Sequence, residues 1–305
     1  MKLTLILSVV IGLYATQVLA DYEKGVMEYR RGNYASAIHE WRQLAEQGDT
    51  RAQHSLAMMH ENGDGVAASE EEAKKWYRLA ADQGYMPAQL SLAELHMRRQ
   101  GDDTSFVEEA ALWYRRAAEQ GSEAAQFQLG LLYLEGRGVA QDDGQAAVWF
   151  EAAAQQGVTN AQNNVGSMYE NGRGVEQDYS RAFEWYERAA RAGDAYAQNN
   201  LGALYAQGRG VEQNHAWAVF WFATALQNGN SIAAGNIEPS LEGLEMRQVS
   251  SAQANIRSGN STEHDVVSSA EYGDELYVLG NINEWTQVYF PKEKVLGWIS
   301  SSLME

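Results

Sequence analysis

The sequence predicts a mainly α fold, a right-handed superhelical solenoid of helix-turn-helix repeats of about 36 residues, followed by a small all-β barrel. Two observations carry this prediction. Three sequence markers recur in phase over most of the chain, and the C-terminal part changes to short runs of β-forming residues. A single helical pair cannot bury its apolar face, so the repeats must stack on one another.

The period is set by a glycine that is followed, after three intervening residues, by Ala and usually Gln. This glycine recurs at intervals of 36 or 37 residues, at Gly48, Gly84, Gly121, Gly157, Gly193 and Gly229. A Trp-aromatic pair keeps the same interval, at Trp76-Tyr77, Trp113-Tyr114, Trp149-Phe150, Trp185-Tyr186 and Trp221-Phe222. The third marker is Gly-x-Gly-Val, which begins at Gly63, Gly136, Gly172 and Gly208.

Each repeat reads as two helices. Ala161, Val165, Met168 and Tyr169 share one face of a first helix. The Gly-x-Gly-Val turn ends that helix, and a second helix starts at an N-cap, carries the Trp-aromatic pair in the core and ends at the next repeat glycine. A glycine inside the first helix, such as Gly166, costs about 1 kcal/mol relative to alanine, so we expect a partner backbone to approach closely there.

These residues resemble the Sel-1-like repeat family, relatives of the tetratricopeptide repeat, from about residue 50 to residue 230. Residues 22–48 resemble a divergent first unit, and residues 97–104 lack the Gly-x-Gly-Val turn. The resemblance implies a scaffold that binds proteins. Bacterial members support envelope assemblies, modulate wall-remodelling enzymes or contact host cells.

The ends of the chain differ from the repeats. Residues 1–20 read as a signal peptide, with Lys2, an apolar run over 3–13 that is too short to span a bilayer, and predicted cleavage after Ala20. We therefore expect a periplasmic or secreted protein with no membrane span after signal removal. The solenoid is predicted over 21–235, and a capping helix, broken near Pro239, with a linker over 236–253.

Residues 254–305 are predicted to form the barrel. Their β-type runs are 266–267, 276–279, 285–290 and 298–299, separated by turn residues. The stretch Asn255-Ile256-Arg257-Ser258-Gly259, together with Gly297-Trp298-Ile299, resembles the bacterial Src-homology-3-type domain. In that family the resemblance implies binding of cell-wall peptides by some members. Acidic residues outnumber basic ones here, which suits anionic wall polymers poorly.

Composition excludes several functions. The net charge of −18 argues against a nucleic-acid groove or a polybasic membrane patch. The absence of cysteine excludes disulfides, thiol catalysis and thiolate metal sites. His60 and His96 occupy the place that tyrosine fills in other repeats, and no histidine pair has metal-ligand spacing. We predict no enzyme activity, metal or cofactor.

The best candidate contacts are polar residues in repeated positions. On the first helices these are the amides of Gln128, Asn163, Asn164, Asn199 and Asn200, which we expect to project into the concave groove; alternatively, they bond between neighbouring repeats. In the turns they are Arg137, Arg173 and Arg209, which are either exposed turn residues or a ladder for an acidic partner.

The sequence thus predicts a non-enzymatic exported adaptor that binds protein partners through the concave face of the solenoid, with the barrel as a second binding site. Two sites on one chain raise avidity. Two alternatives stay open. The barrel could target peptidoglycan or anchor a regulator of cell-wall enzymes, or dispersed carboxylates could form a hydrolase site, which nothing beyond the abundance of Asp and Glu supports.

Overall fold

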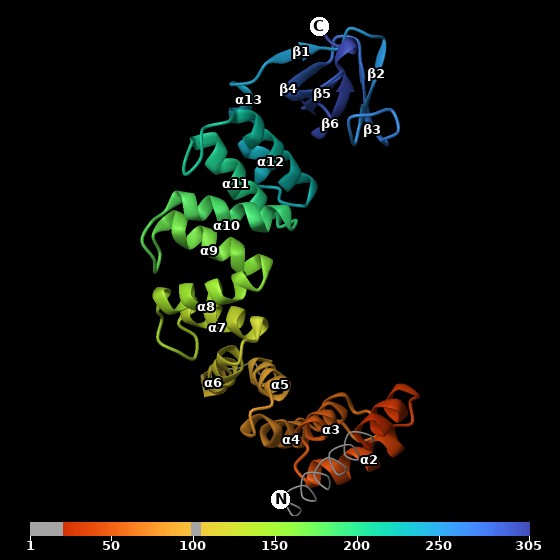
Figure 1. Ribbon diagram of the computed structural model, residues 1–305, viewed down its shortest axis with the longest axis vertical. Helices are drawn as coiled ribbons and strands as arrows, with labels where there is room; N and C mark the ends of the chain where they lie inside the picture. Colours follow the sequence, from red (N-terminus) through yellow and green to blue (C-terminus); the bar gives the residue numbers. More distant parts are fainter. Residues whose placement is uncertain (1–20, 99–104) are drawn as a thin grey trace, which may run out of the picture. The chain divides into compact units, whose positions relative to one another are not determined.

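The repeat unit of the computed structural model is a pair of packed helices joined by a glycine turn (Figure 1). The structure describes residues 21–98 and 105–305. The predicted signal peptide and its cleavage site lie outside the described residues, as does most of the turn that departs from the repeat pattern. The chain divides into two compact units, one ending at Asp142 and the other beginning at Asp143.

The first unit is entirely helical where it is described. Residues 21–30 are helical. They are followed by α2 (Tyr34–Glu46), α3 (Thr50–Asn62), α4 (Glu70–Asp82), α5 (Met86–Met97), α6 (Ser105–Glu119) and α7 (Glu123–Glu135). Helix 21–30 and α2 form the divergent first repeat that the sequence predicts. Trp41 of this repeat and Leu56 of α3 lie in one shared core.

The second unit continues the repeats and adds a β domain. Its helices are α8 (Asp143–Gln155), α9 (Thr159–Asn171), α10 (Tyr179–Arg191), α11 (Ala195–Gln207), α12 (His215–Gln227) and α13 (Ala233–Leu241). Its strands are β1 (Met246–Gln248), β2 (Gln253–Arg257), β3 (Val266–Glu271), β4 (Glu275–Ile282), β5 (Trp285–Phe290) and β6 (Val295–Ser300), before a 3-10 turn (Ser301–Leu303). The predicted fold class, a helical solenoid followed by an all-β domain, is confirmed.

The Gly-x-Gly-Val turn needs both of its glycines. The first, such as Gly172, ends the first helix with φ of 65°, in the left-handed region that favours glycine. A Cβ on the second, Gly174, would lie 2.1 Å from the carbonyl oxygen of Asp143, at the start of the preceding second helix. The turn therefore sets how closely one repeat packs on the one before it.

Close packing inside the first helix takes a different form from the one predicted. A Cβ on Gly166 would lie 2.6 Å from the ring of Tyr186, the second member of a Trp-aromatic pair, so a ring and not a backbone approaches there. The pairs are also not uniformly core. Tyr186 is buried but Trp185 is only half-buried, because neighbouring residues point about 100° apart around a helix.

Two expectations for the segment after the last repeat are wrong. Helix α13 runs through Pro239 to Leu241 and is not broken there. Gly235, whose carbonyl loses its helical donor to the proline, is exposed, so water can bond that carbonyl. Met246, which lies in the predicted capping-helix and linker segment, begins β1, which pairs with β4. Part of the predicted linker thus belongs to the sheet.

The β domain (residues 246–305) is one antiparallel sheet in the order β1-β4-β5-β6-β2-β3. An isolated bridge pairs Met304 with Val249, the residue that follows β1. The core contains Ile256, Leu276 and Val288. Each run predicted as a strand falls within an observed strand.

Candidate protein-binding surfaces

The side-chain amides predicted as partner contacts lie along the first helices of the repeats. Asn200 on α11 donates a hydrogen bond of 3.2 Å from Nδ2 to Asn163 Oδ1 on α9. Asn236 on α13 donates one of 2.8 Å to Asn199 Oδ1 on α11. Three of the five predicted amides therefore take part in the inter-repeat bonding that was the alternative interpretation.

The bonds follow a rule of position. The side chain of the sixth residue after one repeat glycine forms a hydrogen bond with the side chain of the seventh residue after the next repeat glycine. The same rule holds in the first compact unit with other residue types, since His54 Nε2 lies 3.2 Å from Ser91 Oγ. We call this series of side-chain bonds the first-helix ladder.

Two predicted amides have no place in the ladder. By its rule Gln128 would need a polar partner at Leu90, and Asn164 would need one at Phe127, which are both apolar. Within the described chain, neither amide makes a side-chain hydrogen bond, and both are half-buried. These two amides retain their full hydrogen-bonding capacity for a ligand.

The repeated arginines are exposed but have contacts within the chain. Arg137 pairs with a glutamate of its own turn at 3.2 Å, and Arg173 Nε donates to Asp143 Oδ2 at 2.8 Å. The guanidinium of Arg209 lies 5.3 Å from the ring centre of Tyr179. Arg173 and Arg209 thus contact the start of the preceding second helix, and an acidic partner would compete with these contacts.

A set of buried glutamines carries a role that the sequence analysis missed. Each is the Gln of the Ala-Gln marker and donates from Nε2 to a carbonyl at the end of the preceding second helix. The pairs are Gln53 with Ala45, Gln89 with Ala81, Gln126 with Ala118, Gln162 with Ala154, and Gln198 with Ala190. Each of these carbonyls also accepts from the backbone N–H of the repeat glycine that follows it, so the glutamine supplies a second donor at the helix end. The strict recurrence of Gln was the available signal.

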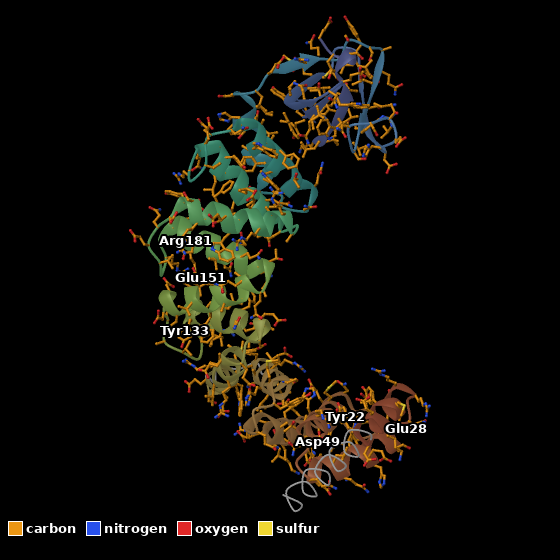
Figure 2. The ribbon with its side chains drawn as sticks, in the orientation of Figure 1. Tyr22, Glu28, Asp49, Tyr133, Glu151 and Arg181 are labelled. Carbon is orange, nitrogen blue, oxygen red and sulfur yellow. The ribbon has the colours of Figure 1, made fainter. Side chains whose placement is uncertain are left out.

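Tyrosine hydroxyls bind charged side chains of neighbouring helices. Tyr169 on α9 donates to Glu151 at 2.5 Å and accepts from Arg181 at 2.5 Å; Figure 2 labels both charged residues. Tyr186 donates to Glu170 at 2.8 Å. Burial, reinforced by Glu170, raises the pKa of Tyr186 far above its usual value. These phenols stay protonated at neutral pH and serve as structural donors.

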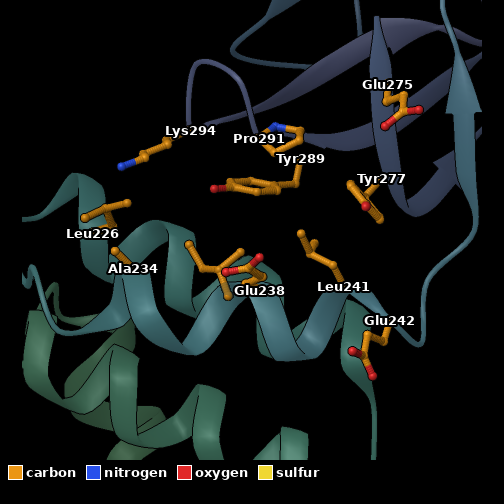
Figure 3. Close-up of a pocket in the computed structure, with 11 residues that line it drawn as sticks. Leu226, Ala234, Glu238, Leu241, Glu242, Glu275, Tyr277, Tyr289, Pro291 and Lys294 are labelled. Atoms are coloured by element: carbon orange, nitrogen blue, oxygen red, sulfur yellow. The ribbon is translucent and has the colours of Figure 1, made fainter.

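A groove lies where the last repeat meets the β domain. Its volume is about 580 Å³, and Figure 3 shows it between α13 and strands β4 and β5. The apolar lining comprises Leu226, Ala234, Ile237, Leu241, Tyr277, Tyr289 and Pro291, and the charged lining comprises Glu238, Glu242, Glu275 and Lys294. The junction is rigid because Tyr289 belongs to one buried cluster with Val219 and Phe222 of α12.

The described residues form no cluster suited to a metal ion. Across 21–98 and 105–305, no group of three or more His, Asp or Glu side chains is placed to hold a metal ion. His96 is buried at the predicted tyrosine position. Burial lowers the pKa of His54, whose ring packs 5.3 Å from that of Tyr77.

Comparison with known families agrees with this geometry. The Sel1 repeat profile matches residues 50–85, 87–122, 123–158, 159–194 and 195–230, more than half of the chain. The chain belongs to the Sel1 repeat family. The bacterial SH3 domain profile matches residues 252–305, which cover β2 to the chain end. The Sel1 repeats thus end at Gly229-Asn230, and α13 caps them.

Solved structures share this repeat architecture. A Sel1 repeat protein from Oxalobacter formigenes is 31% identical over 72% of this chain and 91% of its own, with a TM-score of 0.64. The protective antigen c5321 of uropathogenic Escherichia coli, which displays an SLR fold, is 34% identical over 67% of this chain and 44% of its own, with a TM-score of 0.60.

A sequence relative has a regulatory name. The exopolysaccharide production negative regulator of Rhizobium meliloti (strain 1021) is 38% identical over 68 residues. The match spans 22% of this chain and 25% of that protein, so this chain covers only a quarter of the relative's length. Among the described helices, none combines the length and apolar character needed to cross a membrane.

Proposed function

We propose that this Sel1 repeat protein is a non-enzymatic exported adaptor that binds a protein partner through its first helices and uses the β domain as a second contact. The observation that carries the proposal is an open amide on a first helix in each compact unit, Gln128 in one and Asn164 in the other. The ladder fixes the equivalent amides of other repeats, whereas these two offer donors and acceptors on rigid helices. Half-buried amides in such positions suit recognition of a peptide backbone.

Affinity capture tests this function. The mature chain is expected to retain a stoichiometric partner from extracts of its own cells, identified by mass spectrometry. Gln128→Leu with Asn164→Leu should reduce the retained amount at least about tenfold, because two buried hydrogen bonds are lost. A separate variant, Arg173→Gln, tests whether the turn arginines contact the partner. If the double leucine variant retains the partner fully, these two amides do not bind it, and full retention by Arg173→Gln excludes the turn arginine.

Export is a separate part of the proposal. It is supported by the apolar N-terminal run and by Tyr22, which packs in the first core and accepts a bond from Trp41 Nε1 at 3.2 Å. Cleavage after Ala20 preserves both contacts. N-terminal sequencing of the protein from the cell envelope or medium should begin at Asp21. A cytosolic protein that retains Met1 would contradict export.

A second candidate function is targeting of peptidoglycan by the β domain. It is favoured by a polar groove of about 470 Å³ on this domain, lined by Arg257, Glu284 and Trp285 among others. Co-sedimentation of the full chain with purified peptidoglycan tests it, with Trp285→Ala expected to release the protein and exposed Trp217→Ala as control. A chain that stays in the supernatant rules out this targeting.

A further inference from the structure

The junction groove is built from two rigid walls. One wall is α13, and the other is the surface of strands β4 and β5 with the turn that follows (Figure 3). Helix α12 holds the walls together, since it is apolar on all sides and buries Phe222 and Val219 beneath the β domain. The face of α12 that carries these two residues is covered, whereas Trp217 near its start is exposed. The groove is therefore a fixed feature of the second unit.

Its floor contains an unused donor. Tyr289 is only 3% exposed, and its hydroxyl makes no hydrogen bond to any described residue of the chain. Figure 3 shows this hydroxyl directed into the open space between Leu226 and Lys294. Burial raises the pKa of Tyr289, so the phenol remains a neutral donor. The hydroxyl of this otherwise buried side chain faces the groove without an acceptor from the described residues, and a bound carbonyl would supply one.

Its rim carries unpaired negative charge. Glu238 on α13 and Glu242, which caps the end of this helix, lie four residues apart, and Glu275 begins β4. All three carboxylates are exposed, and within the described residues none has an ion-pair partner. Two like charges at i and i+4 repel each other, so a cation between them is favoured. The nearby Lys292 is already paired with Asp274 at 3.3 Å.

The one ammonium on the rim is Lys294. It stands on the opposite side of Tyr289 from Glu275 (Figure 3) and has a φ of 56°, in the left-handed region. Three carboxylates outweigh one ammonium, so the groove attracts cations. Its volume lies in the range of sites that bind a few residues or a small molecule.

We propose that the junction groove binds an extended basic segment of a partner protein, with aliphatic side chains against Ile237 and Leu241 and lysine or arginine at the glutamates. Tyr289 donates to a backbone carbonyl of that segment. This inference rests on the proposed adaptor function and names the chemistry of the partner. Mixed apolar and charged recognition gives specificity as well as a faster encounter.

Fluorescence anisotropy with three labelled peptides of equal length tests the chemistry, using the full mature chain. One peptide alternates Lys with Leu, the second Lys with Ser, and the third Glu with Leu. The Lys-Leu peptide should bind at least about tenfold more tightly than either other peptide, and its binding should weaken with added salt. Equal binding of the Lys-Ser or Glu-Leu peptide overturns the proposal.

Matched variants locate the binding. Glu238→Gln, Glu242→Gln and Glu275→Gln together should weaken the Lys-Leu peptide about tenfold or more, and Tyr289→Phe should weaken it about three- to tenfold. Lys294→Asn removes the ammonium and keeps a residue type that tolerates positive φ, so this variant should bind the Lys-Leu peptide more tightly. The control changes the same charge elsewhere, at the exposed Glu184, Glu212 and Glu263. An equal loss with the control overturns the proposal.

Affinity capture separates this inference from the adaptor function. If the native chain retains a partner and the triple glutamine variant retains it equally, the groove inference fails while the adaptor function stands. If the native chain retains no partner, the adaptor function fails, and the peptide titration still decides whether the groove has the stated chemistry.

Discussion

At the scale of the residue, glycine has opposite roles in two helices of the same unit. Gly166 is in contact with the ring of Tyr186, and nothing lies within 4 Å of the Cβ position of Gly235 in α13. Alanine is favoured over glycine in a helix by about 1 kcal/mol, so only the space around each site separates the two outcomes.

We therefore expect opposite effects from one substitution. Gly235→Ala should raise the free energy of unfolding by about 1 kcal/mol. Gly166→Ala should lower it, because overpacking against a buried ring costs about 1–3 kcal/mol and exceeds the gain in helix propensity. Chemical denaturation of the two variants measures this difference. A gain in stability at both sites would show that the ring of Tyr186 yields easily.

The buried glutamines are a second residue-scale feature. Gln162→Ala should cost about 0.5–1.5 kcal/mol, because the carbonyl of Ala154 loses a buried side-chain donor and keeps the backbone N–H of Gly157. Gln128→Ala, at a half-buried amide without a hydrogen bond, is the matched control and should change stability by less than about 0.5 kcal/mol. Thermal unfolding followed by circular dichroism compares them. Equal effects would show that the buried bond contributes nothing.

At the scale of the element, caps fix where the helices begin. The Asp49 side chain accepts from the backbone amides of Arg51 and Ala52 at 2.9 and 3.1 Å, and from the Arg51 guanidinium at 2.7 Å. Burial opposes ionisation of Asp49, but these bonds outweigh it and hold the pKa of Asp49 below its usual value. Asp178 and Asn214 also cap their helices, since each side chain accepts from a backbone amide of the first turn.

A depressed pKa gives the sign of the pH dependence. The contribution of Asp49 is complete above the pKa of an unfolded aspartate, about 3.9, and is lost as the pH falls through the lower folded value. Asp49→Ala should cost about 1 kcal/mol at neutral pH, with the difference vanishing in acid. Urea unfolding across this range tests it, with exposed Asp82→Ala as control. A cost that persists in acid would contradict an ionic cap.

At the scale of the second unit, the β domain completes the last repeat. Leu296 on β6 packs against the cluster that contains Phe222 and Tyr289 and lies outside the core of the β domain itself. The apolar surface of α12 thus depends on the β domain for its cover. This dependence distinguishes α12 from α10, which has a charged outer face.

Leu296→Glu should separate the β domain from α12 without unfolding its core. We expect a loss of about 1–3 kcal/mol in the stability of the last repeat, since an unpaired charge is buried. Limited proteolysis should then cut near residues 242–245. Val266→Glu, at an exposed position on β3, is the control. Resistance of the Leu296 variant to both heat and protease would show that the stability of the last repeat does not depend on its contact with the β domain.

The sequence by itself determined the repeat period, the helix pairs, the cap residues and the strand runs. All of these depend on interactions within about ten residues, which periodicity and turn chemistry record directly. It also pointed to the first-helix amides. It could not show which of them bond one another, because that depends on the register between helices 37 residues apart.

Only the tertiary structure decided the rest. The burial of Tyr186 but not Trp185, the entry of Met246 into the sheet and the open amides of Gln128 and Asn164 all follow from how elements pack side by side. The junction groove joins residues 226–242 to residues 275–294, segments that no local pattern relates. Long-range contacts of this kind come from burial of shared apolar surface, which acts without regard to distance along the chain.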